Sequence, residues 1–295
     1  AKAFAAAGIT PKPVTLELGG KSPAIVSTDV PLKDAAERIA FGKTLNAGQT
    51  CVAPDYVLVP QNRVGEFVEA YREAVRGFYP TLADNPDYTA VINERQLARL
   101  NGYISDATSK GALLIELFEQ GQGRRMAHSL LLNVNDEMTV MQDEIFGPLL
   151  PIVPYEHLDQ AFAYINQRPR PLALYYFGYN KAEHHRVLNE THSGGVCLID
   201  TLLHVAQDDL PFGGRCASGR GHYHGHEGFL TFSKAKGVLT QEVLSHGTVG
   251  NTVLDAVNLI PGVSFQNNDP YGGSGGTLTI RGFGFAEGLD LEIGG

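Results

Sequence analysis

Residues 55–60, "DYVLVP", are followed shortly by residues 65–78, "GEFVEAYREAVRGF". The first run is short and apolar, which is typical of a buried strand. The second run repeats its apolar residues every three to four positions and therefore predicts an amphipathic helix with one face toward the core. The residues expected to point inward are Phe67, Val68, Tyr71, Ala74, Val75 and Phe78.

The same alternation of strands and helices continues on both sides of this pair. Before it, "VTLEL" and "PAIVS" are β-prone, and residues 32–48 predict a helix. After it, "LLLNV", "LLPIVPY" and "LALYYFGY" predict buried strands, and the helical run "LDQAFAYINQ" separates the last two. This alternation is typical of an α/β fold with a mostly parallel sheet flanked by helices.

The composition limits the class of protein. The chain has 295 residues, of which 43% are hydrophobic and 19% charged, so it is long enough for one large or two medium domains. Its net charge of −9 argues against binding of nucleic acid. No apolar run reaches the ~18 residues of a membrane span, and the first residues lack the layout of a signal peptide. We therefore expect a cytoplasmic protein that binds neither nucleic acid nor a membrane.

The three cysteines, Cys51, Cys197 and Cys216, are too few and too widely spaced for a disulfide framework. Cys51 closes the stretch "NAGQTC", in which Gly48 allows a close approach of the backbone. Two interpretations of Cys51 stay open from the residues alone. It is either a small buried hydrophobe or a nucleophile whose thiolate is stabilised by a helix N-terminus or by backbone N–H groups.

Acidic residues interrupt apolar sequence at two places. Glu17, in "VTLELGGKSP", is either solvated at a strand end or a partly desolvated base whose raised pKa suits the activation of water. Glu144 and Phe146 lie in "QDEIFGP". They are either an exposed acid and a core aromatic residue, or a carboxylate that binds a ribose diol beside an aromatic wall.

Histidines alternate along "GHYHGHEGF", at positions 222, 224 and 226, but glycines interrupt the run and no suitable Cys or carboxylate completes a ligand set. We therefore expect no metal site. The sequence also contains neither a GxGxxG nor a GxxxxGK[ST] phosphate-binding loop.

Four blocks in a fixed order resemble the aldehyde dehydrogenase family over about residues 1–240. They are "VTLELGGKSPAIV", "NAGQTCVAPDYVLVP", "MQDEIFGPLLPIV" and "LPFGG…SGRGHYHGHEGFLTFSKAKG". The segments "YHGHEGF" and "RPRPLALYYFGY" are similar to the branch that acts on aromatic and fatty aldehydes, with coniferyl aldehyde as the expected type of substrate. The resemblance implies oxidation of an aldehyde to its carboxylic acid with NAD or NADP.

The resemblance also implies a role for each candidate residue. Cys51 matches the nucleophile that forms a thiohemiacetal and then a thioester, and Glu17 matches the base that activates water to hydrolyse the thioester. Glu144 matches the acid that binds the nicotinamide ribose, and Phe146 the aromatic residue beside it. Family members are typically homodimers or homotetramers, which is the expected assembly of the parent protein.

The resemblance divides the chain into parts. Residues 1–21 are expected to be the end of the cofactor-binding domain, residues 22–198 the catalytic domain, and residues 199–240 the segment that returns to the cofactor domain. The family's phosphate-binding half is expected upstream of Ala1, so we expect this chain alone to be inactive in hydride transfer. Three residues depart from the family pattern, since asparagine or small residues are usual at Ile199, Arg215 and Cys216.

The composition changes near residue 240. Residues 241–295 contain 12 of the 34 glycines but one basic residue, Arg281. We therefore expect a boundary between Lys236 and Glu242. This glycine-rich tail resembles part of the plug domain of TonB-dependent outer-membrane receptors, with a helix and turn in "VLDAVNLIPGV" and a strand in "LTIRGFG". The alternative interpretations of the whole chain are a fragment of such a receptor and a non-functional chimera.

Overall fold

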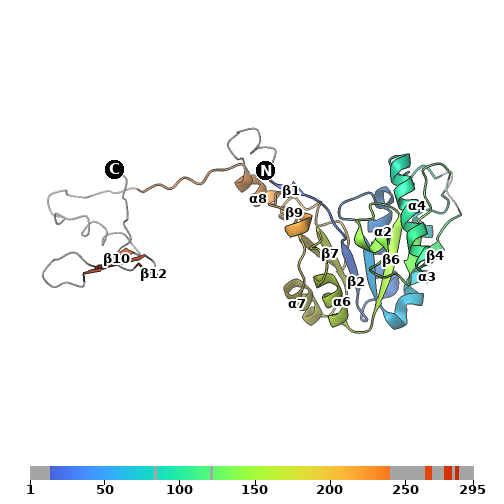
Figure 1. The fold of residues 1–295 in the computed structure, drawn as a ribbon, viewed down its shortest axis with the longest axis horizontal. Helices are drawn as coiled ribbons and strands as arrows, with labels where there is room; N and C mark the ends of the chain where they lie inside the picture. The colour runs from blue at the N-terminus through green and yellow to red at the C-terminus, as the bar shows by residue number, and fades with distance from the viewer. Residues whose placement is uncertain are drawn as a thin grey trace. The chain divides into compact units, whose positions relative to one another are not determined.

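The computed structural model describes residues 14–82, 85–119 and 122–239, together with the backbone of strands at 263–267, 276–280 and 283–285 (Figure 1). The chain divides into two compact units, Ala1–Lys234 and Ala235–Gly295. The division falls just before the boundary region expected from the composition.

A seven-stranded sheet forms the centre of the first unit. In spatial order its strands are β4 (Leu113–Glu116), β5 (Ser129–Leu132), β6 (Leu149–Tyr155), β3 (Tyr56–Pro60), β2 (Pro23–Val26), β7 (Ala173–Phe177) and β8 (Gly195–Leu198). β4 runs antiparallel to β5, and all other neighbouring strands of this sheet are parallel. The prediction of an α/β fold with a mostly parallel sheet is confirmed.

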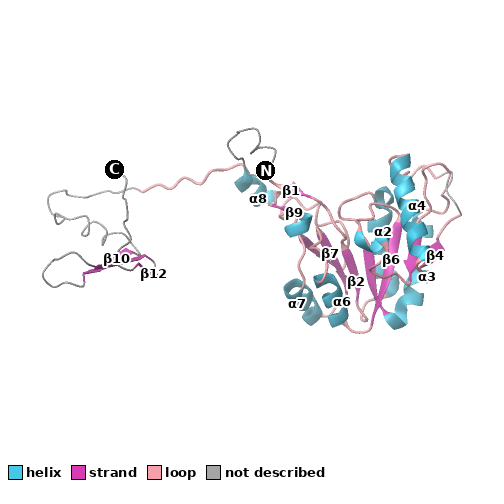
Figure 2. Cartoon of the chain, viewed as in Figure 1, coloured by secondary structure: helices cyan, strands magenta, loops and turns pink. Residues whose placement is uncertain are grey.

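Helices flank this sheet on both faces (Figure 2). They are α2 (Leu32–Thr44) and α3 (Val64–Phe78) on one face, and α4 (Glu94–Ser109), α6 (Leu158–Asn166) and α7 (Lys181–Glu190) on the other. Successive side chains of a strand point to opposite faces, so a strand covered on both sides is apolar along its length. In β3, Val57 and Val59 accordingly join the core with α2 and α3, whereas Tyr56 and Leu58 join the other core.

Helix α3 follows the predicted apolar face, with Phe67, Val68, Tyr71 and Val75 buried. The prediction was wrong for Phe78, which is 38% exposed. Phe78 is the last residue of the helix, and its ring packs edge-on against Phe41 of α2 near the surface.

The helix predicted over residues 32–48 ends earlier, at Thr44. A short 3₁₀ turn covers Leu45–Gly48, in which Asn46, Ala47 and Gly48 have φ angles of 53°, 52° and 72°. Left-handed residues cannot continue a right-handed helix, so the chain turns away here. Cys51 therefore follows the end of a helix and lies in the loop that leads into β3.

A two-stranded antiparallel sheet joins the start of the chain to the end of the first unit. Its strands are β1 (Leu16–Glu17) and β9 (Gly219–Arg220), so the β-prone run "VTLEL" forms only two residues of strand. In the second unit, β10 (Val263–Asn267), β11 (Gly276–Ile280) and β12 (Phe283–Phe285) form an antiparallel sheet. The "TLTI" run lies in β11, whereas the helix predicted around residues 253–259 lies outside the described residues.

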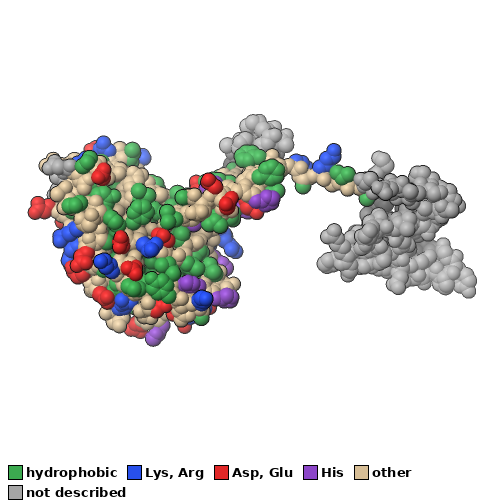
Figure 3. All heavy atoms as spheres, turned by 180° about the vertical axis from the view of Figure 1, so that it is seen from behind, with side chains coloured by type: hydrophobic (Ala, Val, Ile, Leu, Met, Phe, Trp, Pro, Cys, Tyr) green, Lys and Arg blue, Asp and Glu red, His purple; other side chains and the backbone are tan. Residues whose placement is uncertain are grey.

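Acidic, basic and apolar side chains alternate over the described residues on the face of the first unit in Figure 3. Within the described part of the chain, no helix combines the length and the apolar character that crossing a membrane requires.

Two of the three departures from the family pattern have left-handed backbone. Ile199, directly after β8, has a φ of 62°, and Cys216 has a φ of 55°. A side chain with a Cβ is strained in this region, which glycine and asparagine tolerate best. The asparagine or small residues that the resemblance leads us to expect at these two positions would carry less of this strain.

Replacing Cys216 with glycine tests this strain, because the Cys216 side chain is exposed and little packing is lost. We expect Cys216→Gly to have a free energy of unfolding about 1 kcal/mol higher than Cys216→Ala, which retains the Cβ. Urea unfolding of both variants measures the difference. Equal stabilities would contradict the assignment of strain to this position.

Candidate active site

The four residues singled out from the sequence lie at one edge of the sheet. Glu17 precedes β2, Cys51 precedes β3, and both Glu144 and Phe146 precede β6. These strands are parallel neighbours in the order β6, β3, β2, so their amino ends meet at the same edge. The fold therefore brings together segments that are far apart in the sequence.

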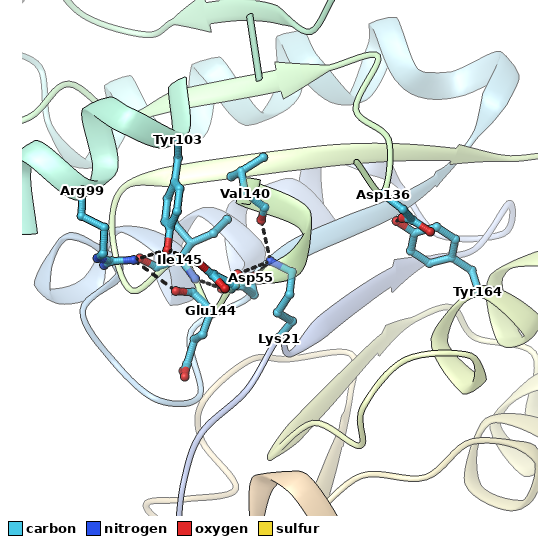
Figure 4. Close-up of polar contacts among 10 residues, drawn as sticks. Lys21, Asp55, Arg99, Tyr103, Asp136, Val140, Glu144, Ile145 and Tyr164 are labelled. Carbon is cyan, nitrogen blue, oxygen red and sulfur yellow. Dashed lines mark hydrogen bonds and ion pairs between the residues drawn. The ribbon is translucent and has the colours of Figure 1, made fainter. Parts of the chain in front are cut away.

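A buried ion pair between Lys21 and Asp55 joins these segments (Figure 4). The side chains are 12% and 4% exposed. Lys21 Nζ also donates to the carbonyl oxygens of Val140 and Asp143, at 2.7 and 2.8 Å, and Asp55 Oδ1 accepts the N–H of Ile145 at 2.8 Å. The pair thus ties the segment after Glu17 and the segment after Cys51 to the loop that carries Glu144.

Helix α4 holds the same loop from its other side. Arg99 donates to the carbonyl oxygens of Ile145 and Glu144, at 2.7 and 3.3 Å, and the Tyr103 hydroxyl donates to Asp143 Oδ2 at 3.0 Å. These bonds fix a turn in which Phe146 has a φ of 48° and a side chain that is 42% exposed. The loop therefore presents the Phe146 ring to the outside, and it is not a core residue.

Two glycines allow the segments to touch. A Cβ at Gly19 would lie 2.6 Å from Oε2 of Glu144, and a Cβ at Gly48 would clash with the carbonyl oxygen of Gly147. Both glycines also have left-handed φ angles, of 75° and 72°. Any side chain at either position would push the Glu144 loop away from the other segments.

The Cys51 thiol is half-buried, and burial raises its pKa above the ordinary value. The negative charges of Glu17 and Glu144 raise this pKa further, while the backbone N–H groups of Cys51 and Val52 act in the opposite direction. Of the two expected sources of thiolate stabilisation, the N–H groups are therefore present. A helix N-terminus is not the source at this loop, because the preceding helix ends here rather than begins.

Burial raises the pKa of Glu144 to about 7, although the N–H of Gly20 donates to its carboxylate and opposes the shift. The charge of Asp55 adds to the increase, whereas Lys21 and Lys43 reduce it. Lys43, in the last turn of α2, is fully buried, and burial lowers its pKa to about 8. Lys43 was not predicted as a buried residue from the sequence. Its position four residues after the buried Ile39 nevertheless indicates an inward-facing side chain.

The Glu17 side chain is exposed, so its carboxylate is open to solvent. The Tyr223 hydroxyl donates to Glu17 Oε1 at 2.9 Å. Tyr223 also lies within electrostatic range of Cys51. The sequence analysis missed Tyr223, because the pairing of β1 with β9 that brings it to Glu17 has no local signal.

A cavity of about 440 Å³ opens on the Glu144 side of this edge. Its lining includes Gly20, Lys21, Gln142, Glu144, Arg168 and Ser218. Cys51 and Glu17 are not among its lining residues. The cavity is therefore placed to receive a group that contacts the Glu144 carboxylate.

Within the described part of the chain, no cluster of three His, Cys, Asp or Glu side chains is arranged to hold a metal ion. The alternating histidines make other contacts, and the His224 ring stacks on Phe212. His222 Nε2 lies 2.8 Å from Glu227 Oε2, and the His226 ring stacks on Phe229.

Breaking the buried ion pair should cost far more stability than breaking an exposed one. We expect Asp55→Asn to lower the free energy of unfolding by about 3 kcal/mol, because Lys21 loses its buried counter-charge. The matched control is Asp200→Asn, which breaks the more exposed pair with Arg38 and should cost about 1 kcal/mol or less. Urea unfolding measures both. Similar small losses in the two variants would show that the Lys21–Asp55 pair does not hold the segments together.

The raised pKa of Glu144 should make stability depend on pH. Folding raises this pKa from an ordinary value of 4.5 to about 7, so the folded state binds the proton more tightly and the free energy of unfolding falls as pH rises between these values. Glu144→Gln removes this decrease. Because solvent screens a partly exposed carboxyl, we expect the variant to gain about 1–2 kcal/mol relative to the parent between about pH 5 and about pH 8.

Urea unfolding at the two pH values measures this gain, with Glu156→Gln as a control at an exposed carboxyl. If the difference between Glu144→Gln and the parent is the same at both pH values, Glu144 does not titrate in this range.

Residues 1–238 match the aldehyde dehydrogenase family. A probable coniferyl aldehyde dehydrogenase of Pseudomonas aeruginosa is 75% identical over 229 residues, which cover 78% of this chain and 48% of the relative. A coniferyl aldehyde dehydrogenase of a Pseudomonas species is 51% identical over 235 residues, which cover 78% of this chain and 49% of the relative. The chain thus spans about half the length of the curated relatives that it matches.

Solved structures agree with these matches. The substrate-bound state of Staphylococcus aureus AldH has a TM-score of 0.72 and 40% sequence identity, and the match covers 81% of this chain and 53% of that chain. An indole-3-acetaldehyde dehydrogenase in complex with NAD⁺ has a TM-score of 0.70 and 27% identity, over 80% of this chain and 49% of that chain. Sequence and fold therefore lead to one assignment: the chain belongs to the aldehyde dehydrogenase family.

Proposed function

We propose that this chain provides the catalytic half of an NAD(P)-dependent oxidation of an aromatic aldehyde, of the coniferyl type, to its carboxylic acid. The observation that carries the proposal is the position of the Cys51 thiol, within electrostatic range of both the Glu17 and the Glu144 carboxylates, at one edge of an aldehyde dehydrogenase fold. The coniferyl-type substrate is supported by the names of the two Pseudomonas relatives.

In the proposed reaction, Cys51 Sγ loses its proton and forms a bond to the aldehyde carbon, giving a thiohemiacetal. Burial and two nearby negative charges oppose the thiolate, so the proton must pass to a base, and we assign this role to Glu144, whose pKa burial raises to about 7. The N–H groups of Cys51 and Val52 are directed at the sulfur. We assign to the Cys51 N–H group a part in stabilising the oxyanion that forms on the adjacent carbon.

The second half of the reaction is hydrolysis of the thioester on Cys51. Glu17 is exposed to solvent and is held by Tyr223, so water can reach its carboxylate. We assign to Glu17 the removal of a proton from the water that attacks the thioester carbon, after which the Cys51 thiolate leaves.

The residues around Glu144 fit a nicotinamide ribose. A Cβ at Gly19 would clash with the Glu144 carboxylate, which lines the cavity of about 440 Å³, and the exposed ring of Phe146 follows two residues later in the same loop. A carboxylate accepts hydrogen bonds from both hydroxyls of a diol. When bound, the cofactor supplies the acceptor for the hydride that leaves the substrate carbon.

Residues outside this chain are proposed to complete the site. The segment that carries Glu17 exposes two apolar side chains, Leu16 at 42% and Leu18 at 58%. Such side chains are suited to packing against the part of the relatives that this chain does not match. We therefore propose that the 295-residue chain alone does not transfer hydride. We also propose, from the family resemblance, that the whole protein is a cytoplasmic homodimer or homotetramer.

For residues 241–295 we propose a separate origin. The family match ends at residue 238, and strands β10, β11 and β12 form a sheet of their own. A plug-like fragment of a TonB-dependent receptor agrees with these observations, and the chain would then be a chimera. Sequencing of the surrounding gene distinguishes a receptor from such a chimera, since a receptor requires barrel strands to continue after residue 295.

The proposed reaction is tested by joining this chain to the preceding half of the Pseudomonas aeruginosa relative and measuring reduced nicotinamide with coniferyl aldehyde. We expect turnover by the joined protein, none by the chain alone, and a loss of at least about 1,000-fold in Cys51→Ser. Glu17→Gln should give one rapid turnover and then slow release, because only thioester hydrolysis is impaired. Cys216→Ser, at an exposed thiol, is the control.

Retained activity in Cys51→Ser would refute the nucleophile. Hydride transfer by the unjoined chain would refute the need for residues outside it.

A further inference from the structure

Four aromatic side chains form a continuous row between the Cys51 loop and Glu17. Neighbouring rings meet edge to face, with centroids 5.9, 6.0 and 5.9 Å apart, in the order Tyr175, His204, Phe212 and Tyr223. At one end the Tyr175 hydroxyl donates to the carbonyl oxygen of Val52, next to Cys51. At the other end the Tyr223 hydroxyl donates to Glu17. These contacts therefore link the loop of Cys51 to Glu17, the two residues proposed to act one after the other.

His204 differs from the other members of the row, because it has two ring nitrogens to satisfy. It is 8% exposed, Nδ1 lies 3.3 Å from Cys197 Sγ, and Nε2 is buried with no hydrogen-bond partner among the residues that the structure describes. A buried polar atom without a partner costs about 1–3 kcal/mol. A phenylalanine, whose ring is somewhat larger, has no ring nitrogen to satisfy. Stability alone therefore does not explain an imidazole at this position.

The contact with Cys197 is a neutral hydrogen bond. Burial raises the pKa of Cys197 and lowers the pKa of His204, so neither group is charged at neutral pH. The pair is therefore not an activated nucleophile of the kind that needs a thiolate. The bond instead fixes the orientation of the His204 ring. The ring has room in this orientation because residue 195 is glycine, and a Cβ there would lie 2.8 Å from His204 Cδ2.

We propose that His204 is a positioning residue, whose ring is oriented by the Cys197 thiol and sets the spacing between the Cys51 loop and Glu17. This inference rests on the proposed function, since the spacing matters only if water activated by Glu17 attacks a thioester on Cys51. An error of about 1 Å between reacting groups lowers a rate by about 100-fold. Transfer of an acyl group to Cys51 does not use Glu17, so it should not depend on the row.

The experiment uses the full chain and p-nitrophenyl acetate, which acylates a cysteine without any cofactor. The burst of p-nitrophenolate reports acylation of Cys51, and the steady rate reports hydrolysis of the thioester. We expect His204→Phe to raise the melting temperature, because the unpaired nitrogen is removed, and to lower the steady rate at least about tenfold with the burst unchanged. Cys197→Ala, which frees the imidazole ring, should lower the steady rate in the same way.

A matched control lies on the opposite face of the sheet. His184 meets Tyr176 edge to face, with ring centroids 5.7 Å apart, as His204 meets Tyr175. His184→Phe should leave both the burst and the steady rate unchanged.

A steady rate in His204→Phe equal to that of the parent would overturn the inference, and so would a parallel loss of burst and steady rate. Absence of a Cys51-dependent burst in the parent chain would overturn the proposed nucleophile, and the inference with it. The two failures are therefore distinguishable.

Discussion

The arrangement of the site depends on the ion pair between Lys21 and Asp55. Lys21 follows the glycines after Glu17, Asp55 follows the loop of Cys51, and both bind the loop that carries Glu144. A buried pair of this kind persists only when its remaining hydrogen-bonding groups are also satisfied, and here backbone carbonyls and an N–H satisfy them. The sheet alone brings the segments of Glu17, Cys51 and Glu144 to the same edge. The ion pair and its hydrogen bonds fix these three segments to one another.

The position and charge of the site follow from this arrangement. In open α/β sheets ligands usually bind at the carboxyl ends of the strands, whereas these residues gather at the amino ends of β2, β3 and β6. Two carboxylates beside the thiol raise its pKa, so the groups proposed to take part in catalysis also suppress the reactive thiolate. The site is therefore expected to gain reactivity when one carboxylate is protonated or when a positive charge binds nearby.

The sequence predicted the sheet, the presence of α2 and most of the inward face of α3, because periodicity of apolar residues is a local signal. It also predicted Cys51, Glu17, Glu144 and Phe146 through their motifs, although their roles remain proposals. It did not predict Tyr223, Lys43 or the row through His204. These residues acquire their partners only when distant segments pair, as β1 does with β9. The end of α2 was also missed, since the left-handed backbone at Ala47 opposes the preference of alanine for a right-handed helix.

The central claim is that Cys51 and Glu144 share one electrostatic environment, and the pH dependence of Cys51 alkylation tests it most directly. The rate constant for reaction of Cys51 with iodoacetamide, followed by mass spectrometry of the Cys51 peptide, gives the pKa of the thiol in the parent and in Glu144→Gln. We expect a lower pKa of the Cys51 thiol in the variant, because the negative charge of Glu144 raises this pKa in the parent. Titration curves that coincide would contradict it, since the two side chains would then not share a site.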